Sequence, residues 1–207
     1  MVSRMKCKRL LAVACLIAVS ISALPAFGED AKGNAGKEEA PAPLYAPGDQ
    51  AISIRLGVFW PLFYLSFTPA VTATNLTLGG GGALQWGAYL TESITLSGEL
   101  GGNFAYSPNW NILLQLPMLA KVEKIFTFYP FEIPISLAAG VSFVKYEDLW
   151  AVDMTVKPGI AFFWIYNSSW SFGVNAEYWM NTQISGTADQ SRVGNFLSVF
   201  LSALYRF

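Results

Sequence analysis

The amino-acid sequence predicts an all-β protein, an eight-stranded antiparallel transmembrane β-barrel. Between residues 51 and 60, Ile, Leu, Val and Trp occupy every second position, which is the pattern of a strand with two different faces. After Asp49 only about a tenth of the residues are charged, against about a quarter in a soluble domain. Gly, Pro or charged residues interrupt every apolar run there, so no segment is suited to a spanning helix. Because backbone polar groups in lipid all need partners, such a chain is expected to close into a barrel.

The first 28 residues have the organisation of a signal peptide. Basic residues between positions 4 and 9 precede an apolar run, and small residues at 26–28 flank a cleavage point. A retained membrane anchor is the weaker alternative, since Pro25 interrupts a run that is already short for spanning. Both cysteines, Cys7 and Cys15, lie in this segment, so the mature chain is expected to have no thiol. Lipidation at Cys15 is a minor alternative, because Ala12 stands where a lipoprotein signal prefers Leu.

The predicted domains are the signal peptide at 1–28, a leader at 29–49 and the barrel at 50–207. The leader is rich in Ala, Gly, Pro, Lys and Glu, a composition that cannot bury enough apolar surface to offset its ordering entropy. We therefore expect a disordered periplasmic segment, with contact to peptidoglycan or a partner as the alternative.

Seven further segments alternate as 51–60 does and complete a set of eight strands. The strands are expected at 51–60, 80–90, 94–104, 110–121, 131–146, 154–164, 170–180 and 195–207. An even number of strands about ten residues long is what a bilayer-spanning barrel requires. With the N-terminus in the periplasm, connections 91–93, 122–130 and 166–169 are periplasmic, whereas 61–79, 105–109, 147–153 and 181–194 face outward.

One face of these strands gathers polar side chains, which we expect to line the barrel lumen. They are Arg55, Gln85, Glu99, Lys121, Glu132, Lys157, Glu177 and Arg206. The lumen of an eight-stranded barrel is barely wider than the side chains that fill it, so mixed charges favour a structural ion network over an open aqueous pore. Since unpaired buried charges are costly, Arg55 and Lys157 are each expected to contact a carboxylate such as Glu99 or Glu177.

Aromatic residues divide between the lumen and the expected membrane interfaces. The apolar lumen residues are Phe59, Tyr89, Phe163 and Trp179, and the interface residues are Trp60, Trp164, Trp170, Tyr205 and Phe207. The interface set falls at or near strand ends, where an amphipathic ring can lie at headgroup level. Aromatic packing in a soluble core would instead place rings at strand centres. A lumen with both polar and apolar walls suits a small hydrophobic or amphipathic ligand.

The C-terminal strand ends on Phe207 and resembles the assembly signal of bacterial outer-membrane barrels. That resemblance implies outer-membrane lipid and the barrel-assembly machinery as partners. The segments that carry a second resemblance are Leu113-Leu114-Gln115-Leu116-Pro117, residues 133–143 and Tyr205-Arg206-Phe207. They are similar to the OmpW-like family of small outer-membrane barrels. The short leader and the signal peptide resemble those of spirochaetal examples. The OmpW-like resemblance covers the barrel region and implies passage of small hydrophobic or weakly polar molecules through a narrow lumen.

Two functions follow from the sequence. The first is a narrow outer-membrane channel for such a small hydrophobic solute. The second is a non-conducting surface protein whose exposed outer loops, at 61–79 and 181–194, bind host components or act as antigens.

Other classes of function are disfavoured. The chain has no histidine and so lacks the commonest general base and zinc ligand; no enzyme, metal or cofactor is expected. Calcium-loop spacing is not found, and no basic patch indicates nucleic-acid binding. A soluble lipid carrier would need a charged outer face, but the strands at 51–60 and 195–207 have one Arg each outside their apolar face.

Overall fold

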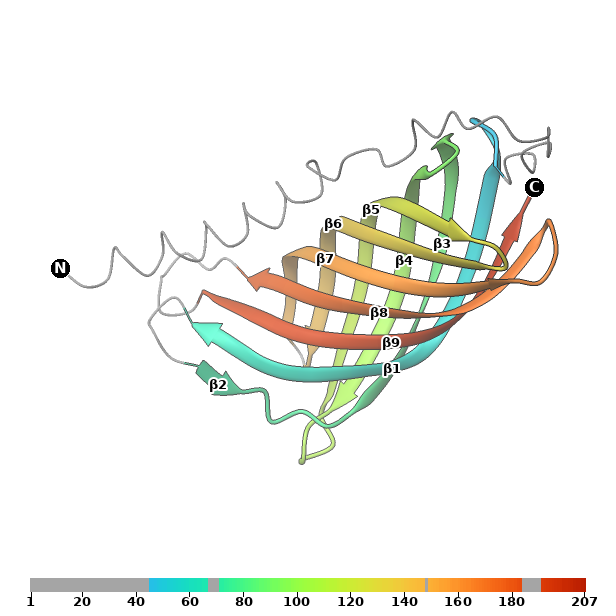
Figure 1. The fold of residues 1–207 in the computed structure, drawn as a ribbon. Coiled ribbons are helices and arrows are strands. Elements are labelled where there is room, and N and C mark those ends of the chain that lie inside the picture. Colours follow the sequence, from blue (N-terminus) through green and yellow to red (C-terminus); the bar gives the residue numbers. More distant parts are fainter. Residues whose placement is uncertain (1–44, 67–70, 148, 184–190) are drawn as a thin grey trace, which may run out of the picture. The chain divides into compact units, whose positions relative to one another are not determined.

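The structure, a computed structural model, describes residues 45–66, 71–147, 149–183 and 191–207. The predicted signal peptide and residues 29–44 of the predicted leader lie outside these residues. Eight long antiparallel strands close into a barrel, and one short strand is added at its end (Figure 1). The predicted fold class is confirmed.

The strands follow one another around the barrel in sequence order. They are β1 (Gln50–Ser66), β2 (Val71–Ala73), β3 (Gly79–Thr91), β4 (Ile94–Tyr106), β5 (Ile112–Phe128), β6 (Phe131–Tyr146), β7 (Leu149–Ile165), β8 (Trp170–Gln183) and β9 (Arg192–Arg206). Strand β1 pairs with β3 on one side and with β9 on the other, which closes the sheet. We call the end where β1 begins and β9 finishes the inner end, and the opposite end the outer end. The short β2 pairs with the outer end of β1.

Side chains alternate between the interior and an apolar exterior. In β1, Arg55 and Phe59 are buried, whereas Ile54, Leu56 and Val58 between and beside them are exposed. This is the reverse of a soluble protein, in which the charged face of a strand meets water and the apolar face is buried. The period of two therefore places the mixed-charge face of each strand in the lumen, as in the predicted arrangement.

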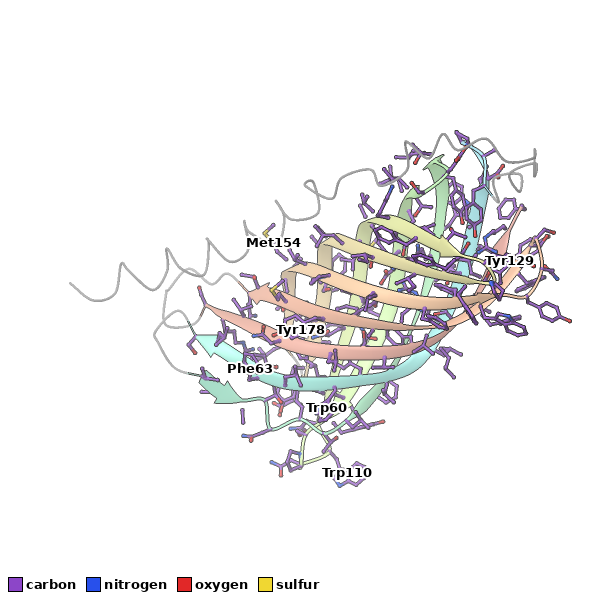
Figure 2. The ribbon with its side chains drawn as sticks, viewed as in Figure 1. Trp60, Phe63, Trp110, Tyr129, Met154 and Tyr178 are labelled. Atoms are coloured by element: carbon purple, nitrogen blue, oxygen red, sulfur yellow. The ribbon has the colours of Figure 1, made fainter. Side chains whose placement is uncertain are left out.

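Several predicted strand ends are wrong because pairing continues beyond them. The expected connection at 122–130 is instead mostly strand: β5 runs to Phe128, which pairs with Phe131 across a turn at Tyr129 and Pro130. Strand β7 begins at Leu149, not at 154, and so includes residues expected in an outer connection. Trp110 was expected to begin a strand but lies in a turn with a positive φ of 62°, before β5. Figure 2 shows Trp110 and Tyr129 at opposite ends of the barrel.

Glycine permits a close approach at the seam between β1 and β9. A Cβ atom on Gly57 would lie 2.1 Å from the carbonyl oxygen of Val199 and 2.9 Å from Cδ1 of Phe200. Such distances are shorter than any real contact, so this position needs a residue without a side chain. The space left by Gly57 admits the Phe200 ring into the lumen, where it is buried.

Candidate functional site: the barrel lumen

The structure places all twelve predicted lumen residues on the inward face of the barrel, each at most 8% exposed. They belong to three layers along the barrel. A central cluster consists of Arg55, Gln85, Glu99, Lys121, Glu123, Lys157 and Glu177. An aromatic layer consists of Phe59, Trp179 and Phe196, and an inner layer consists of Tyr45, Tyr89, Glu132 and Arg206. Phe163 lies beside the inner layer.

Two cations and two carboxylates form the heart of the central cluster. Arg55 Nη2 lies 2.5 Å from Glu99 Oε2, and Lys157 Nζ lies 2.8 Å from Glu177 Oε2. Arg55 also pairs with Glu177, and Lys157 with Glu99. The pairing expected from the sequence is therefore present, and each cation contacts both carboxylates. The four side chains come from β1, β4, β7 and β8, so their attraction acts across the lumen and not only between neighbouring strands.

Lys121 on β5 extends this network. Its Nζ lies 2.9 Å from Glu123 Oε1 and 3.4 Å from Glu177 Oε1. Gln85 donates a hydrogen bond of 2.7 Å from Nε2 to Glu123 Oε2. The cluster thus balances three cations with three carboxylates. Glu123 was not among the predicted lumen residues; extending the alternation of β5 two residues past Lys121 would have identified it.

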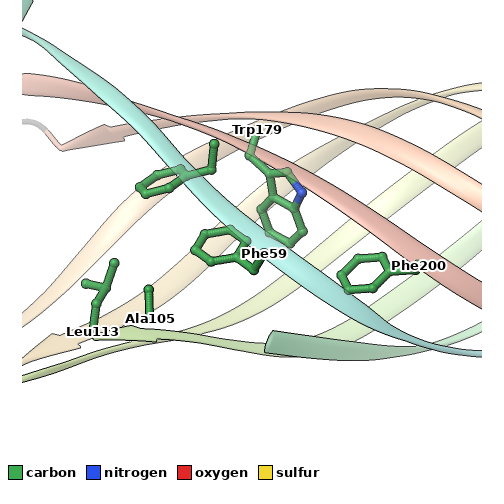
Figure 3. Close-up of a cluster of buried hydrophobic side chains, with 6 residues drawn as sticks. Phe59, Ala105, Leu113, Trp179 and Phe200 are labelled. Atoms are coloured by element: carbon green, nitrogen blue, oxygen red, sulfur yellow. The ribbon is translucent and has the colours of Figure 1, made fainter. Parts of the chain in front are cut away.

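The aromatic layer lies on the outer side of the charges. Lys157 Nζ is 4.4 Å from the Trp179 ring centroid, and Trp179 meets the Phe59 ring edge-on at 6.0 Å. Phe59 in turn stacks on Phe196 at 5.0 Å. Trp179 donates a 2.7 Å hydrogen bond to Ser198 Oγ, so its indole nitrogen is satisfied. Figure 3 shows these rings together with Phe200, Leu113 and Ala105 as one buried cluster. Phe196, two positions before Ser198 on the same face of β9, could have been predicted by continuing the alternation.

The inner layer includes a residue from the predicted leader. Tyr45 is 3% exposed and stacks on Tyr89 with ring centroids 4.5 Å apart. Arg206 lies 4.9 Å from the Tyr45 ring centroid and donates a 2.8 Å hydrogen bond to Glu132 Oε2. The backbone nitrogen of Gly48 donates to the Tyr89 carbonyl. Residues 45–49, the end of the predicted leader, are thus held against the inner end of the barrel. A cavity of about 30 Å³ lies beside this layer, lined in part by Phe163 and Glu132.

A larger cavity of about 560 Å³ occupies the outer end of the lumen; we call it the outer chamber. Phe196 and Leu113 of the buried cluster contribute to its wall, and residues 72–76 contribute at the side of β2. Asp153, expected on an outer connection, belongs to β7 and is buried on the chamber wall. Arg192 stands over the Tyr64 ring at 5.1 Å. Neither Tyr64 nor Arg192 was singled out from the sequence, because both lie beyond the predicted strand ends.

The predicted interface aromatics lie on the exterior. Trp60, Trp164, Trp170 and Phe207 are exposed, and Tyr205 is half-buried against Trp170, with ring centroids 4.9 Å apart. Strand β1 continues from Trp60 to Ser66, so Trp60 does not lie at the end of its strand as expected. The rings from β8 and β9 form a group at the inner end.

Within the described residues, no group of three or more His, Cys, Asp or Glu side chains is arranged to hold a metal ion. No helix in the same part of the chain has the length and apolar character needed to cross a membrane.

The chain is similar in sequence to a known protein family and to proteins of two spirochaetes. The model of a Treponema-specific protein family matches residues 30–205. The chain belongs to this family. An uncharacterised protein of Borreliella burgdorferi is 27% identical over 191 residues, covering 82% of this chain and 88% of the relative. Another from Treponema pallidum is 22% identical over 199 residues, covering 89% and 91%. The spirochaetal part of the predicted resemblance is confirmed.

Among solved structures, Neisserial surface protein A has the same fold. Its crystal structure aligns with a TM-score of 0.55 and 8% identity, covering 79% of this chain and 99% of that protein. At this identity the likeness concerns the barrel architecture alone.

Proposed function

We propose that this protein is an integral outer-membrane β-barrel and a narrow channel for small hydrophobic or weakly polar molecules, closed in the state described above. The observation that carries the channel proposal is the outer chamber of about 560 Å³. Its inner side is closed by the aromatic layer, where the side chains of Phe196 and Phe59 stack on each other. The barrier at this point consists of side chains and not of backbone. Because side chains can change rotamer without breaking the sheet, this layer and the central cluster beside it are the parts that must move to admit a solute.

The exterior of the barrel supports a position in the membrane. Leu56 and Leu201 face each other across the pair β1 and β9 and are 67% and 70% exposed. A closed barrel leaves no unpaired strand edge along its wall, which is the condition for crossing lipid. The long strands have 13 to 17 residues, more than the roughly 9–11 that a tilted strand needs. Trp60, about one such span from the start of β1, suits the outer interface.

The chamber lining supports the solute class. Leu76, Leu113 and Val144 offer apolar surface, whereas Gln115 and Asn181 offer amide groups. Cavities of about 300–1,000 Å³ with mainly apolar walls and a few polar groups are typical of small-molecule sites. The OmpW-like resemblance implies the same kind of solute.

A second function, a non-conducting surface protein, is favoured by the filling of the lumen. The central cluster and the aromatic layer occupy the section between the two cavities, and the inner cavity of about 30 Å³ has room for about one water molecule. At the outer end, Trp110 is 81% exposed and offers apolar surface to a partner. In this alternative, the outer turns contact host components and no solute crosses.

Flux measurements in liposomes separate the two functions. The mature chain is refolded into liposomes, and swelling is recorded with weakly polar solutes such as 1,4-butanediol and N-methylacetamide, with the hydrophilic sugar arabinose as the comparison. We expect slow flux above protein-free liposomes, and a severalfold increase when Phe59→Ala and Phe196→Ala are combined to thin the aromatic layer. Val58→Ala, on the neighbouring outward position, is the matched control and should behave as the parent. If folded wild-type and double-variant barrels both leave liposomes as tight as protein-free ones, the channel is excluded and the surface function stands.

A further inference from the structure

Polar side chains with unused hydrogen-bonding groups line the outer chamber. Among the described residues, Asn181 finds no partner for Oδ1 or Nδ2, Gln115 none for Oε1 and Asp153 none for Oδ1. Their exposed fractions are 2%, 1% and 8%, and all three line the same cavity. Buried polar groups in native proteins are nearly always satisfied. Three such residues on one cavity wall therefore leave hydrogen-bonding groups available to whatever fills the chamber, either water or a polar group of a ligand.

The strand register places these groups on one side of the wall, with Val144 between Gln115 and the other two. Asn181 on β8 is paired with Thr155 on β7, and Asp153 is the next inward residue along β7. Residues related in this diagonal way lie about 7–8 Å apart, so one ligand group between Asn181 and Asp153 can reach both. Gln115 on β5 lies beyond the intervening strand β6, where it pairs with Val144. The polar part of the wall thus extends from β5 to β8.

Another part of the wall is apolar and aromatic. Phe196, Leu113 and Leu76 line the chamber, and Tyr64 packs edge-on against Phe196 with ring centroids 6.2 Å apart. This surface suits an apolar or aromatic body, while the polar wall suits a head group that forms hydrogen bonds.

The charges of the chamber favour a donor over an acceptor in that head group. Three of the four unused atoms are oxygens, and one of them belongs to the carboxylate of Asp153. Arg192 also lines the chamber; its Nε donates a 2.9 Å hydrogen bond to Gln183 and its guanidinium lies over Tyr64. The charges of Arg192 and Asp153 are opposite, so the preference is set by which of them the head group contacts. A head group held by Asn181 lies beside Asp153, where an ammonium is attracted and a carboxylate or phosphate is repelled.

We propose that the outer chamber binds small amphipathic molecules in which an apolar or aromatic body carries a hydrogen-bond-donating head group, a primary ammonium or an alcohol. The inference rests on the proposed function, because it names the class of molecule that enters the channel. Asp153 selects for the ammonium, and Asn181 and Gln115 hold either head group. The apolar body lies against Phe196 and Leu113.

Three probes with one aromatic body test the head group. Binding of 2-phenylethylamine, 2-phenylethanol and phenylacetate to the refolded mature barrel is measured in detergent by isothermal titration calorimetry, with empty micelles as the blank. We expect the amine to bind at least tenfold more tightly than phenylacetate, with the alcohol between them. Equal affinity for all three probes, or no binding above the blank, would overturn the proposal.

Two variants assign the binding to the polar wall. Asp153→Asn keeps the shape of the side chain and should weaken the amine at least fivefold while leaving the alcohol within twofold. Asn181→Leu should weaken both. The matched controls are Glu92→Gln, which removes one charge from the exposed turn after β3, and Thr182→Val, on the outward position beside Asn181. Each variant is first checked for folding by heat-modifiable gel mobility. Folded Asp153→Asn and Asn181→Leu barrels with wild-type affinities for both probes would refute the site.

Liposome flux distinguishes failure of this inference from failure of the channel. If solutes cross the membrane but the head-group preference is absent, the inference is wrong and the channel stands. If the head-group preference is present but no solute crosses, the chamber is a binding site in a sealed barrel, and the proposed channel function is wrong.

Discussion

At the scale of single residues, Glu177 has more ionic partners than any other described side chain. It pairs with Arg55, Lys121 and Lys157, and so ties β8 to three other strands through the lumen. A buried ion pair adds little net stability compared with a well-packed apolar replacement, but loss of one partner leaves an uncompensated charge. The balance of the cluster therefore depends most strongly on this one carboxylate.

Replacing Glu177 with Gln should destabilise the barrel. The change leaves three cations facing two carboxylates, and breaking a buried pair in this way costs about 3–5 kcal/mol. Urea unfolding in liposomes, followed by tryptophan fluorescence, measures the effect. The control, Glu92→Gln in the exposed turn after β3, removes the same charge and should shift the free energy of unfolding by less than about 0.5 kcal/mol. Equal midpoints for the two variants would contradict a structural role for the cluster.

The sequence predicted most of the residues that face the lumen and two of their ion pairs. Alternation along a strand shows which side chains share a face, and the need for charge balance shows which of them must pair. Arg55 and Lys157 had to find carboxylates, and those on the same face were Glu99 and Glu177. Continued alternation would also have placed Glu123 and Phe196 on the inward face, but it could not have shown which residues they contact across the lumen. Those contacts depend on strand tilt, which alternation does not encode. Tyr45 lies before the first predicted strand, so its place in the lumen could not be found in this way.

At the scale of elements, the seam between β1 and β9 depends on Gly57. A Cβ there would meet the Val199 carbonyl oxygen at 2.1 Å, and backbone cannot move away without loosening the pairing. Gly57→Ala should therefore lower the folded fraction of the protein. It should destabilise the barrel by about 1–3 kcal/mol, the usual cost of overpacking.

Gly98→Ala is the matched control for this prediction. Gly98 lies on β4, where no atom of the described residues comes within 4 Å of the added Cβ. Refolding yield and unfolding midpoint of this variant should match the parent. A Gly57→Ala barrel as stable as Gly98→Ala would show that the seam has room that the structure does not indicate.

Strand ends were harder to predict than strand existence. The segment 122–130 contains charged residues and a proline, and this composition favours a loop, yet full pairing with β6 continues to Phe128. The pairing wins because each ladder hydrogen bond satisfies backbone groups that would otherwise need water. Strand β2 is too short for an alternating pattern, and forms through its register with Phe63, Tyr64 and Leu65.

At the scale of the whole molecule, the distribution of polarity is inverted. Charges pair inside the barrel, and the exterior of the strands is apolar. An exposed side chain should therefore contact lipid if it lies near the middle of the barrel wall, and water or headgroups if it lies near an end. Leu201, near the middle of β9, and Val71, in β2 at the outer end, are both 70% exposed. If the barrel spans a bilayer, the first side chain contacts lipid tails and the second lies beyond them.

Arginine substitution at these two positions tests the membrane position directly. Leu201→Arg should destabilise the barrel in liposomes by about 2–4 kcal/mol, the cost of a cation at the bilayer midplane, whereas Val71→Arg should cost about 0–1 kcal/mol. Unfolding by urea in liposomes gives both values on one scale. In water, two equally exposed leucine or valine side chains would tolerate arginine equally. Equal values for the two variants would therefore mean that the apolar exterior does not face lipid, and a difference of the expected size would locate the bilayer around the middle of β9.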